Sequence, residues 1–134
     1  MALRIDLRDG ERVVVNGAVL RAKGNLRLEV ENRVAILRSS DVMKPEAANT
    51  PARRLYYTCM LAYIDEPQRK QHLDNLLPLL KDLVDAFEAP EVKHVCSNFA
   101  AFVATQDLYK ALTECKKIMA YEDGALARSN QTAA

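Results

Sequence analysis

The spacing of apolar residues changes once along the chain, near residue 50, and this change limits the possible folds more than any other feature. Before it, apolar and charged residues alternate with a period of two, the pattern of strands that have one buried and one exposed face. After it, apolar residues recur at three- and four-residue intervals, the pattern of amphipathic helices. The sequence therefore predicts an α+β fold, with a small N-terminal antiparallel β-sheet of four or five strands followed by a C-terminal bundle of about four helices.

Turn residues divide the first part of the chain into short segments. Asn16-Gly17 is the strongest hairpin signal, and Asp9-Gly10 and Lys23-Gly24-Asn25 mark further turns. A sheet of about 40 residues cannot bury its apolar face alone. It therefore needs helices over it or a second copy of itself.

Proline and capping residues divide the second part into helices. Thr50-Pro51 has the pattern of an N-cap followed by proline, and the first helix is expected to end near Ile64. Pro78 lies inside the second helical stripe and is expected to kink or split that helix. Gly124 is expected to end the fourth helix. The expected organisation is a β subdomain over residues 1–44, a helical subdomain over 45–124 and a flexible tail over 125–134.

The composition indicates a folded cytoplasmic protein. Hydrophobic residues make up 49% of the 134 residues, which is enough for a packed core. The three cysteines, Cys59, Cys96 and Cys115, are too widely spaced for a disulfide framework or a zinc site, so we expect buried, reduced thiols. The N-terminus lacks a signal-peptide pattern. The longest uncharged stretch, 94–106, is shorter than the roughly 20 residues that span a bilayer.

No motif in the sequence indicates an enzyme. His72 and His94 are far apart, and neither has a metal-ligand partner at a suitable spacing. The sequence contains no phosphate-binding or nucleophile-elbow motif, and Cys59 has no histidine near it. We therefore expect a protein without catalytic residues, cofactor or metal.

The charge distribution is uneven, although the net charge is only +1. Residues 1–54 contain 11 Lys/Arg and 7 Asp/Glu, whereas residues 55–134 contain 8 and 11. The cations of the predicted sheet could face phosphates and unpaired bases, and they are Arg4, Arg8, Arg12, Arg21, Lys23, Arg27, Arg33 and Arg38. The alternative is a solvated face with cross-strand ion pairs to Asp6, Glu29 and Glu31, which the residue types alone favour.

Two further patterns each have two interpretations. Arg53-Arg54 lies in the first turn of a predicted helix, where cations are electrostatically unfavourable. The pair could form an anion site with the helix amides, or salt bridges to the sheet. The leucine-rich stripe from Leu76 to Phe87 is interpreted as core, with a groove for a partner helix as the alternative.

Several segments resemble the flagellar biosynthesis repressor FlbT family in sequence, order and spacing. They are MALR (1–4), GERVVVNGA (10–18), VAILR (34–38), DVM (41–43) and TPARRLY (50–56). The resemblance implies a post-transcriptional regulator that binds the 5′ untranslated region of flagellin mRNA, represses its translation and promotes its degradation. It also implies action with a second flagellar protein, FlaF, and leaves open whether a given member represses or activates.

The N-terminal half also resembles the carbon storage regulator family of RNA-binding proteins. The shared pieces are a first strand over Leu3–Arg8, the Gly10-Glu11 turn, the Lys23-Gly24-Asn25 turn and a late strand ending at Arg38. In that family, intertwined dimerisation brings the first and last strands together into the RNA surface. The resemblance implies RNA contacts by Arg4, Arg8 and Arg38, although the segment between the two turns is shorter here.

We therefore predict a non-enzymatic regulator of flagellin synthesis that binds RNA through its basic sheet. Its expected partners are the flagellin mRNA leader, FlaF, flagellin and a second copy joined through the β subdomain, with no membrane. The predicted RNA-binding residues are Arg4, Arg8, Lys23, Arg27, Arg38, Arg53 and Arg54. The alternative function is a protein-binding adaptor or flagellin-secretion chaperone that acts with FlaF without contacting RNA.

Overall fold

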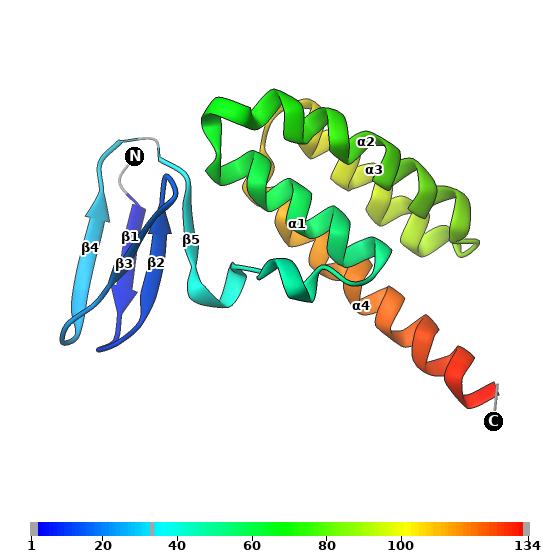
Figure 1. Ribbon diagram of the computed structural model, residues 1–134, viewed down its shortest axis with the longest axis horizontal. Helices are drawn as coiled ribbons and strands as arrows, with labels where there is room; N and C mark the ends of the chain where they lie inside the picture. The colour runs from blue at the N-terminus through cyan, green and yellow to red at the C-terminus, as the bar shows by residue number, and fades with distance from the viewer. Residues whose placement is uncertain (1–2, 33, 133–134) are drawn as a thin grey trace. The chain divides into compact units, whose positions relative to one another are not determined.

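The predicted α+β fold is confirmed by the computed structural model, which describes residues 3–32 and 34–132, with side chains up to Arg128. Strands occupy the first part of the chain and helices the remainder (Figure 1). The strands are β1 Leu3–Leu7, β2 Arg12–Val15, β3 Ala18–Arg21, β4 Leu26–Val30 and β5 Ile36–Arg38. The α-helices are α1 Pro51–Ile64, α2 Arg69–Ala86, α3 Pro90–Ala104 and α4 Leu108–Thr132. Short 3-10 turns follow β5, precede α1 and join α1 to α2, at Ser39–Asp41, Pro45–Ala47 and Glu66–Gln68.

The described residues form two compact units. The β unit contains the residues up to Val42 together with Ile64–Glu66, and the helical unit contains Met43–Tyr63 and the residues from Pro67 onward. Among the described residues, no helix combines the length and the hydropathy that a bilayer crossing requires.

The strands form two small antiparallel sheets rather than one. β1 pairs with β4, and β2 pairs with both β3 and β5 in the order β3-β2-β5. The apolar side chains of the alternating segments share one core, whose buried members are Ile5, Leu7, Val13, Ala22 and Ile36. The half-buried residues packed against that core are Val15, Leu26, Leu28, Val30 and Val34.

The β2–β3 hairpin has the turn that its sequence predicts. Asn16 and Gly17 have φ angles of 49° and 86°, the left-handed pair of a type I′ turn. The Asn16 side chain also accepts a hydrogen bond from the Ala35 N–H at 3.0 Å, and the Asn16 N–H donates to the Ala35 carbonyl at 2.9 Å. The turn therefore also fixes the chain where it enters β5.

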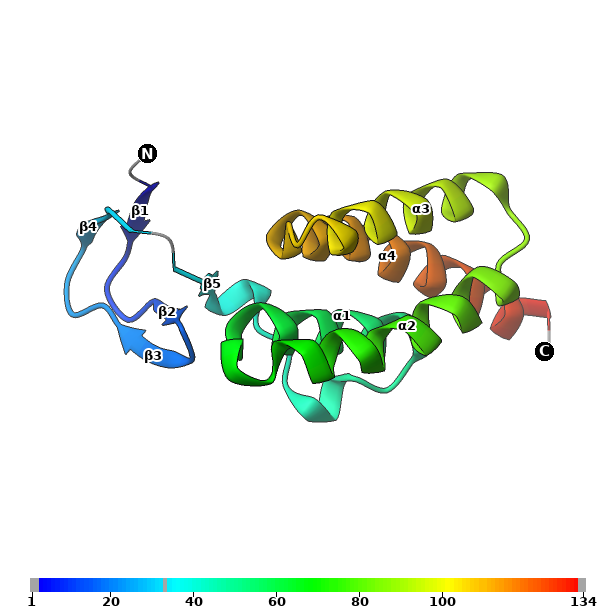
Figure 2. The ribbon, with the colours of Figure 1, turned by 90° about the horizontal axis from the view of Figure 1, so that it is seen from above.

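The leucine-rich stripe of α2 contributes to the core of the helical unit, as predicted. Leu76, Leu80 and Leu83 are buried, whereas Leu77, which lies off this stripe, is 58% exposed. Figure 2 shows the four helices of the unit, with α3 running alongside α4. Pro78 does not split α2, which is continuous through that position.

The prediction that the fourth helix ends at Gly124 is wrong. α4 continues through Gly124 to Thr132, so residues 125–132 of the expected tail are helical, and residues 133–134 lie outside the described residues. One glycine costs an exposed helix only about 1 kcal/mol relative to alanine. The residues that follow it, Ala125 to Arg128, are good helix formers and offset that cost.

The N-terminus of α1 is capped from two directions. The Thr50 hydroxyl accepts a hydrogen bond from the Arg53 N–H at 3.2 Å, as the sequence predicts for an N-cap. The Glu122 carboxylate of α4 accepts one from the Ala52 N–H at 2.9 Å. Glu122 is only 6% exposed, and a carboxylate at a helix N-terminus also interacts favourably with the helix dipole. Residues 70 positions apart are thereby joined in the interior of the helical unit.

Two glycine-to-alanine substitutions should have opposite effects on stability. Gly17→Ala should lower the free energy of unfolding by about 1–2 kcal/mol, because Gly17 has a left-handed backbone. Gly124→Ala should raise it by about 0.5–1 kcal/mol, because Gly124 is helical and the added methyl group would lie 3.5 Å from the Arg128 guanidinium, an ordinary contact. Urea denaturation of both variants checks the pair. A destabilising Gly124→Ala would contradict the helical continuation.

Removing the Glu122 cap should destabilise the helical unit. We expect Glu122→Ala to cost about 1–3 kcal/mol, because the buried Ala52 N–H loses its acceptor. Glu122→Gln should cost less, since its amide oxygen can still accept the hydrogen bond. Glu88→Ala, which removes an exposed carboxylate, is the control and should change stability by less than about 0.5 kcal/mol. Thermal unfolding measures the difference, and equal melting temperatures for Glu122→Ala and Glu88→Ala would refute the cap.

Candidate nucleic-acid interface

Side-chain hydrogen bonds tie together the turns at one end of the β unit. The Asp9 carboxylate accepts a hydrogen bond from the Gly24 N–H at 2.6 Å, and the Asp9 N–H donates to the Asn25 side-chain oxygen at 3.0 Å. The Glu11 carboxylate accepts one from the Arg8 N–H at 2.9 Å. Two turns that are distant in the sequence are therefore held against each other, which fixes the backbone at Arg8 and on both sides of Lys23.

A β-bulge bends the chain at the same place. The Gly10 N–H donates to the Ala22 carbonyl and the Ala22 N–H donates to the Glu11 carbonyl, both at 2.8 Å, so two residues oppose one. Gly10 has φ 85°, the left-handed value of the first residue in a glycine-type bulge. Bulges re-aim the side chains beside them, and here the neighbours are Arg8 and Glu11.

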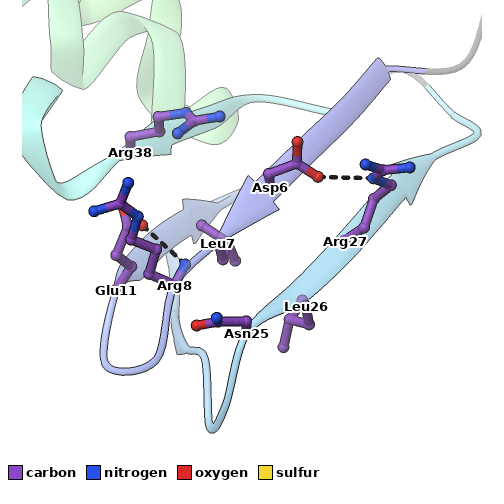
Figure 3. A pocket seen from close by; sticks show the side chains of 8 residues that line it. All are labelled: Asp6, Leu7, Arg8, Glu11, Asn25, Leu26, Arg27 and Arg38. Carbon is purple, nitrogen blue, oxygen red and sulfur yellow. Dashed lines mark hydrogen bonds and ion pairs between the residues drawn. The ribbon is translucent and has the colours of Figure 1, made fainter.

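An open groove of about 570 Å³ lies beside these turns (Figure 3). It is bordered by the end of β1, the turn that follows it, the start of β4 and the end of β5. Its lining residues are Asp6, Leu7, Arg8, Glu11, Asn25, Leu26, Arg27 and Arg38. Three guanidinium groups, two carboxylates and one amide therefore surround a shallow apolar floor.

The three arginines of the groove differ in how they are engaged. The Arg27 Nε donates to the Asp6 carboxylate at 2.8 Å, and that hydrogen bond raises the pKa of Arg27. Arg8 and Arg38 are exposed, and neither has an ion pair within the described residues. In Figure 3 their side chains lie across the groove from Asp6 and Arg27. Arg8 and Arg38 are therefore the groove cations that are available to an outside anion.

Cross-strand ion pairs account for two of the predicted RNA-binding residues. Arg4 is opposite Glu29 and Asp6 is opposite Arg27 in the β1–β4 register, and the side chains of each pair meet, at 3.9 Å and 2.8 Å. Such exposed pairs contribute little to stability, because water screens them. Lys23 is exposed at its turn and has no ion pair in the described part of the chain. The solvated-face interpretation is thus correct for Arg4 and Arg27, whereas Arg8, Lys23 and Arg38 have no such pair.

Neither prediction for the Arg53-Arg54 pair describes Arg53. Its guanidinium makes a two-pronged contact with the Asp123 carboxylate of α4, at 3.0 and 3.1 Å, rather than a salt bridge to the sheet. In the same helix turn, the Ala52 N–H donates to the Glu122 carboxylate and the Arg53 N–H donates to the Thr50 hydroxyl. The anion at this helix N-terminus is therefore supplied by the chain itself. Arg54 is exposed and has no ion pair among the described residues.

Two classes of residue were missed by sequence reasoning. The roles of Glu122 and Asp123 could not be predicted, because nothing in a sequence pairs position 122 with position 52. The neighbouring Gly124 also suggested a helix end. Asn25 and Glu11 were treated as turn residues only. Their one signal was the presence of hydrogen-bonding side chains in turns that flank arginine-bearing strands.

The cysteines are buried thiols rather than candidate nucleophiles. All three are free and have at most 1% exposure. Burial raises the pKa of Cys59 to about 12, and it raises the pKa of Cys96 and Cys115 as well. Because the thiolate is the reactive form, burial disfavours reaction at all three thiols. Within residues 3–32 and 34–132, no group of three His, Cys, Asp or Glu side chains is placed to hold a metal ion.

Comparison with known proteins gives a consistent set of relatives. The family model "Flagellar protein FlbT" matches residues 3–126. The Caulobacter sp. strain K31 protein named "Probable flagellum biosynthesis repressor protein FlbT" is 34% identical over 128 residues, which are 94% of this chain and 97% of the relative. The Caulobacter vibrioides CB 15 protein named "Flagellum biosynthesis repressor protein FlbT" is 33% identical over 128 residues, with 94% and 90% covered. A Rhizobium johnstonii relative with the first of these names is 35% identical over 125 residues, with 92% and 83% covered. No solved structure is significantly similar to the chain.

Proposed function

The chain belongs to the FlbT family of flagellar proteins, and from that premise we propose that it represses flagellum biosynthesis after transcription. In this proposal it binds the 5′ untranslated region of flagellin mRNA, reduces translation of the message and promotes its degradation. The names of its relatives support the repressor role. The β unit supplies the RNA-binding surface.

The groove is the main structural feature that supports this proposal. Arg8 and Arg38 line one concave surface, and neither is neutralised by a carboxylate within the described residues. Arginine binds phosphate through two parallel hydrogen bonds and stacks on exposed bases. The Asn25 amide and the Glu11 carboxylate beside them offer hydrogen-bond partners for base edges. A surface of this kind suits a single-stranded or looped RNA, whose bases are open to contact.

The near-neutral charge of the chain favours local recognition over general attraction to RNA. The net charge is +1, so there is little long-range field to bind RNA of any sequence. Affinity must then come from a few contacts at the tied turns, where the carboxylates of Glu11 and Asp9 hold the backbone amides of Arg8 and Gly24. A protein bound there would block ribosome entry and leave the message open to nucleases.

We also propose a homodimer through the β unit. β1 lies at one edge of a two-stranded sheet, and two-stranded sheets are marginal on their own. β5 lies at one edge of the three-stranded sheet. Pairing between copies would enlarge both sheets and would place two sets of groove arginines in one particle.

The alternative, an adaptor or secretion chaperone that acts with FlaF or flagellin, needs an open apolar groove on the helices. The buried state of Leu76, Leu80 and Leu83 gives that model less support than the exposed groove gives RNA binding. FlaF or flagellin retained after nuclease treatment, together with no preference for the leader RNA, would favour the alternative.

Removing the two groove arginines should weaken binding to the flagellin leader. We expect Arg8→Ala with Arg38→Ala to lose about tenfold or more in affinity, and to flatten the dependence of log affinity on log salt by roughly 1.4, for two phosphates on a single strand. Fluorescence anisotropy with the leader and with a scrambled RNA of equal length, across a salt series, measures both quantities.

The matched control removes the same charge from the same unit. Arg12→Ala with Arg21→Ala deletes two exposed arginines that do not line the groove. If this control loses as much leader affinity as the groove variant, binding depends on net charge and the groove model fails. If the unsubstituted protein does not distinguish the leader from the scrambled RNA at any salt, the RNA-binding proposal itself fails.

The dimer has its own test. Light scattering of the purified protein should give twice the chain mass of 15.0 kDa at micromolar concentration. A mass of 15.0 kDa that stays constant up to high concentration would contradict the dimer and leave the groove of a single chain as the RNA site.

A further inference from the structure

The strand β3 is an uncovered edge of the three-stranded sheet. Among the described strands it alone has no buried or half-buried residue, since Ala18 to Arg21 are all exposed. Val19 is 65% exposed and Leu20 is 48% exposed, and the two side chains project from opposite faces of the sheet. This edge strand therefore leaves apolar side chains uncovered on both of its faces.

The backbone of β3 presents hydrogen-bonding groups in a definite register. A two-residue type I′ turn makes Val15 and Ala18 a hydrogen-bonded pair, so the pairs alternate from there. The Ala22 N–H bond to the Glu11 carbonyl follows the same alternation. The N–H and C=O groups of Val19 and Arg21 therefore point away from β2, toward the open edge.

The last cross-strand pair of β3 brings two like charges together. Arg12 and Arg21 are directly opposite each other in the β2–β3 register, and both are exposed. Like charges in this relation are destabilising. Lys23 follows two residues later. A carboxylate placed beside Arg21 would relieve the repulsion.

We propose that β3 binds an extended segment of a partner protein, which adds to the sheet as a further strand. The segment bonds to the outward backbone groups of Val19 and Arg21, places apolar residues beside Val19 and Leu20, and carries an acidic residue opposite Arg21. Main-chain hydrogen bonds supply affinity in this mode, and the alternate side chains supply specificity.

Three features of the edge favour a peptide over RNA as its occupant. The outward N–H and C=O groups alternate with the two-residue period of a β-strand. The RNA backbone has no amide groups, so it cannot exchange paired N–H···O=C hydrogen bonds with each outward residue as a peptide strand does. Short edge strands that carry a cation can resist pairing; here, however, the cation is at one end, and Val19 and Leu20 are uncovered at the centre.

Peptide selection against the whole chain tests the proposal. A displayed library of random peptides of about ten residues, long enough to pair along a four-residue strand, is selected on the immobilised protein. We expect enrichment of an acidic and an apolar residue two positions apart. The affinity of an enriched peptide is then measured by anisotropy, and Arg21→Glu and Leu20→Lys should each reduce it by about tenfold or more.

A peptide of reversed charge and two control variants away from β3 show whether peptide binding depends on this edge. A lysine in place of the acidic residue of the peptide should restore binding to Arg21→Glu. Leu77→Lys, which changes another exposed leucine in the helical unit, and Arg8→Ala with Arg38→Ala should bind the peptide as the unsubstituted protein does. Circular dichroism confirms that each variant is folded.

Three results would overturn the proposal. One is enrichment of no acidic-apolar peptides. Another is peptide binding that is indifferent to Leu20→Lys and Arg21→Glu. The third is a dimer that Val19→Lys dissociates, because the second copy would then be the occupant of β3. None of these results affects leader binding by Arg8 and Arg38, so the RNA proposal is judged separately.

Discussion

The backbone amides at the start of α1 need acceptors, and the way they are satisfied organises the helical unit. A helix leaves its first four N–H groups without partners inside the helix. The Thr50 hydroxyl accepts a hydrogen bond from the nearby Arg53 N–H, and the buried Glu122 carboxylate of α4 accepts one from the Ala52 N–H. Asp123 then binds the Arg53 guanidinium. Both acidic residues lie directly before Gly124, so these two contacts fix the part of α4 that leads into the glycine, and the helix continues beyond it to Thr132.

This long-range capping shows where prediction from sequence stops. The bounds of α1 and the Asn16-Gly17 turn follow from local chemistry, since a cap, a proline and a left-handed pair act on their immediate neighbours. The buried leucines of α2 follow from helical spacing. By contrast, the division of the strands into two sheets depends on which strands pair, and the Glu122–Ala52 bond depends on tertiary packing. Neither the strand pairing nor this hydrogen bond can be recognised from residues that are adjacent in the sequence.

The same distinction applies to the candidate site. Residue type and alternation identified a set of cations, but they could not separate those with carboxylate partners from those without. Register decides this for the strands: Arg4 and Arg27 have carboxylates directly across the β1–β4 pair, whereas Arg8 and Arg38 lie at the ends of their segments, beside turns. A carboxylate beside Arg4 and Arg27 offsets their charge locally and so weakens their attraction for a phosphate, even though such exposed pairs add little stability. Position relative to the turns therefore matters more than the number of arginines.

Small size makes the tied turns important to any recognition by the β unit. The apolar cluster between its strands has five buried members, and Val14 and Leu37 are buried besides, which is a small core for holding loops rigid by packing alone. The hydrogen bonds of Asp9 to both Gly24 and Asn25 supply that rigidity where Arg8 and Lys23 emerge. Because the backbone that carries Arg8 and Lys23 is already ordered, less conformational entropy is lost there when a ligand binds. Glu11 contributes at two points, because its carboxylate holds the Arg8 amide while its carbonyl binds the Ala22 N–H at the end of β3. The groove and the exposed edge of β3 thus depend on the same short stretch of backbone.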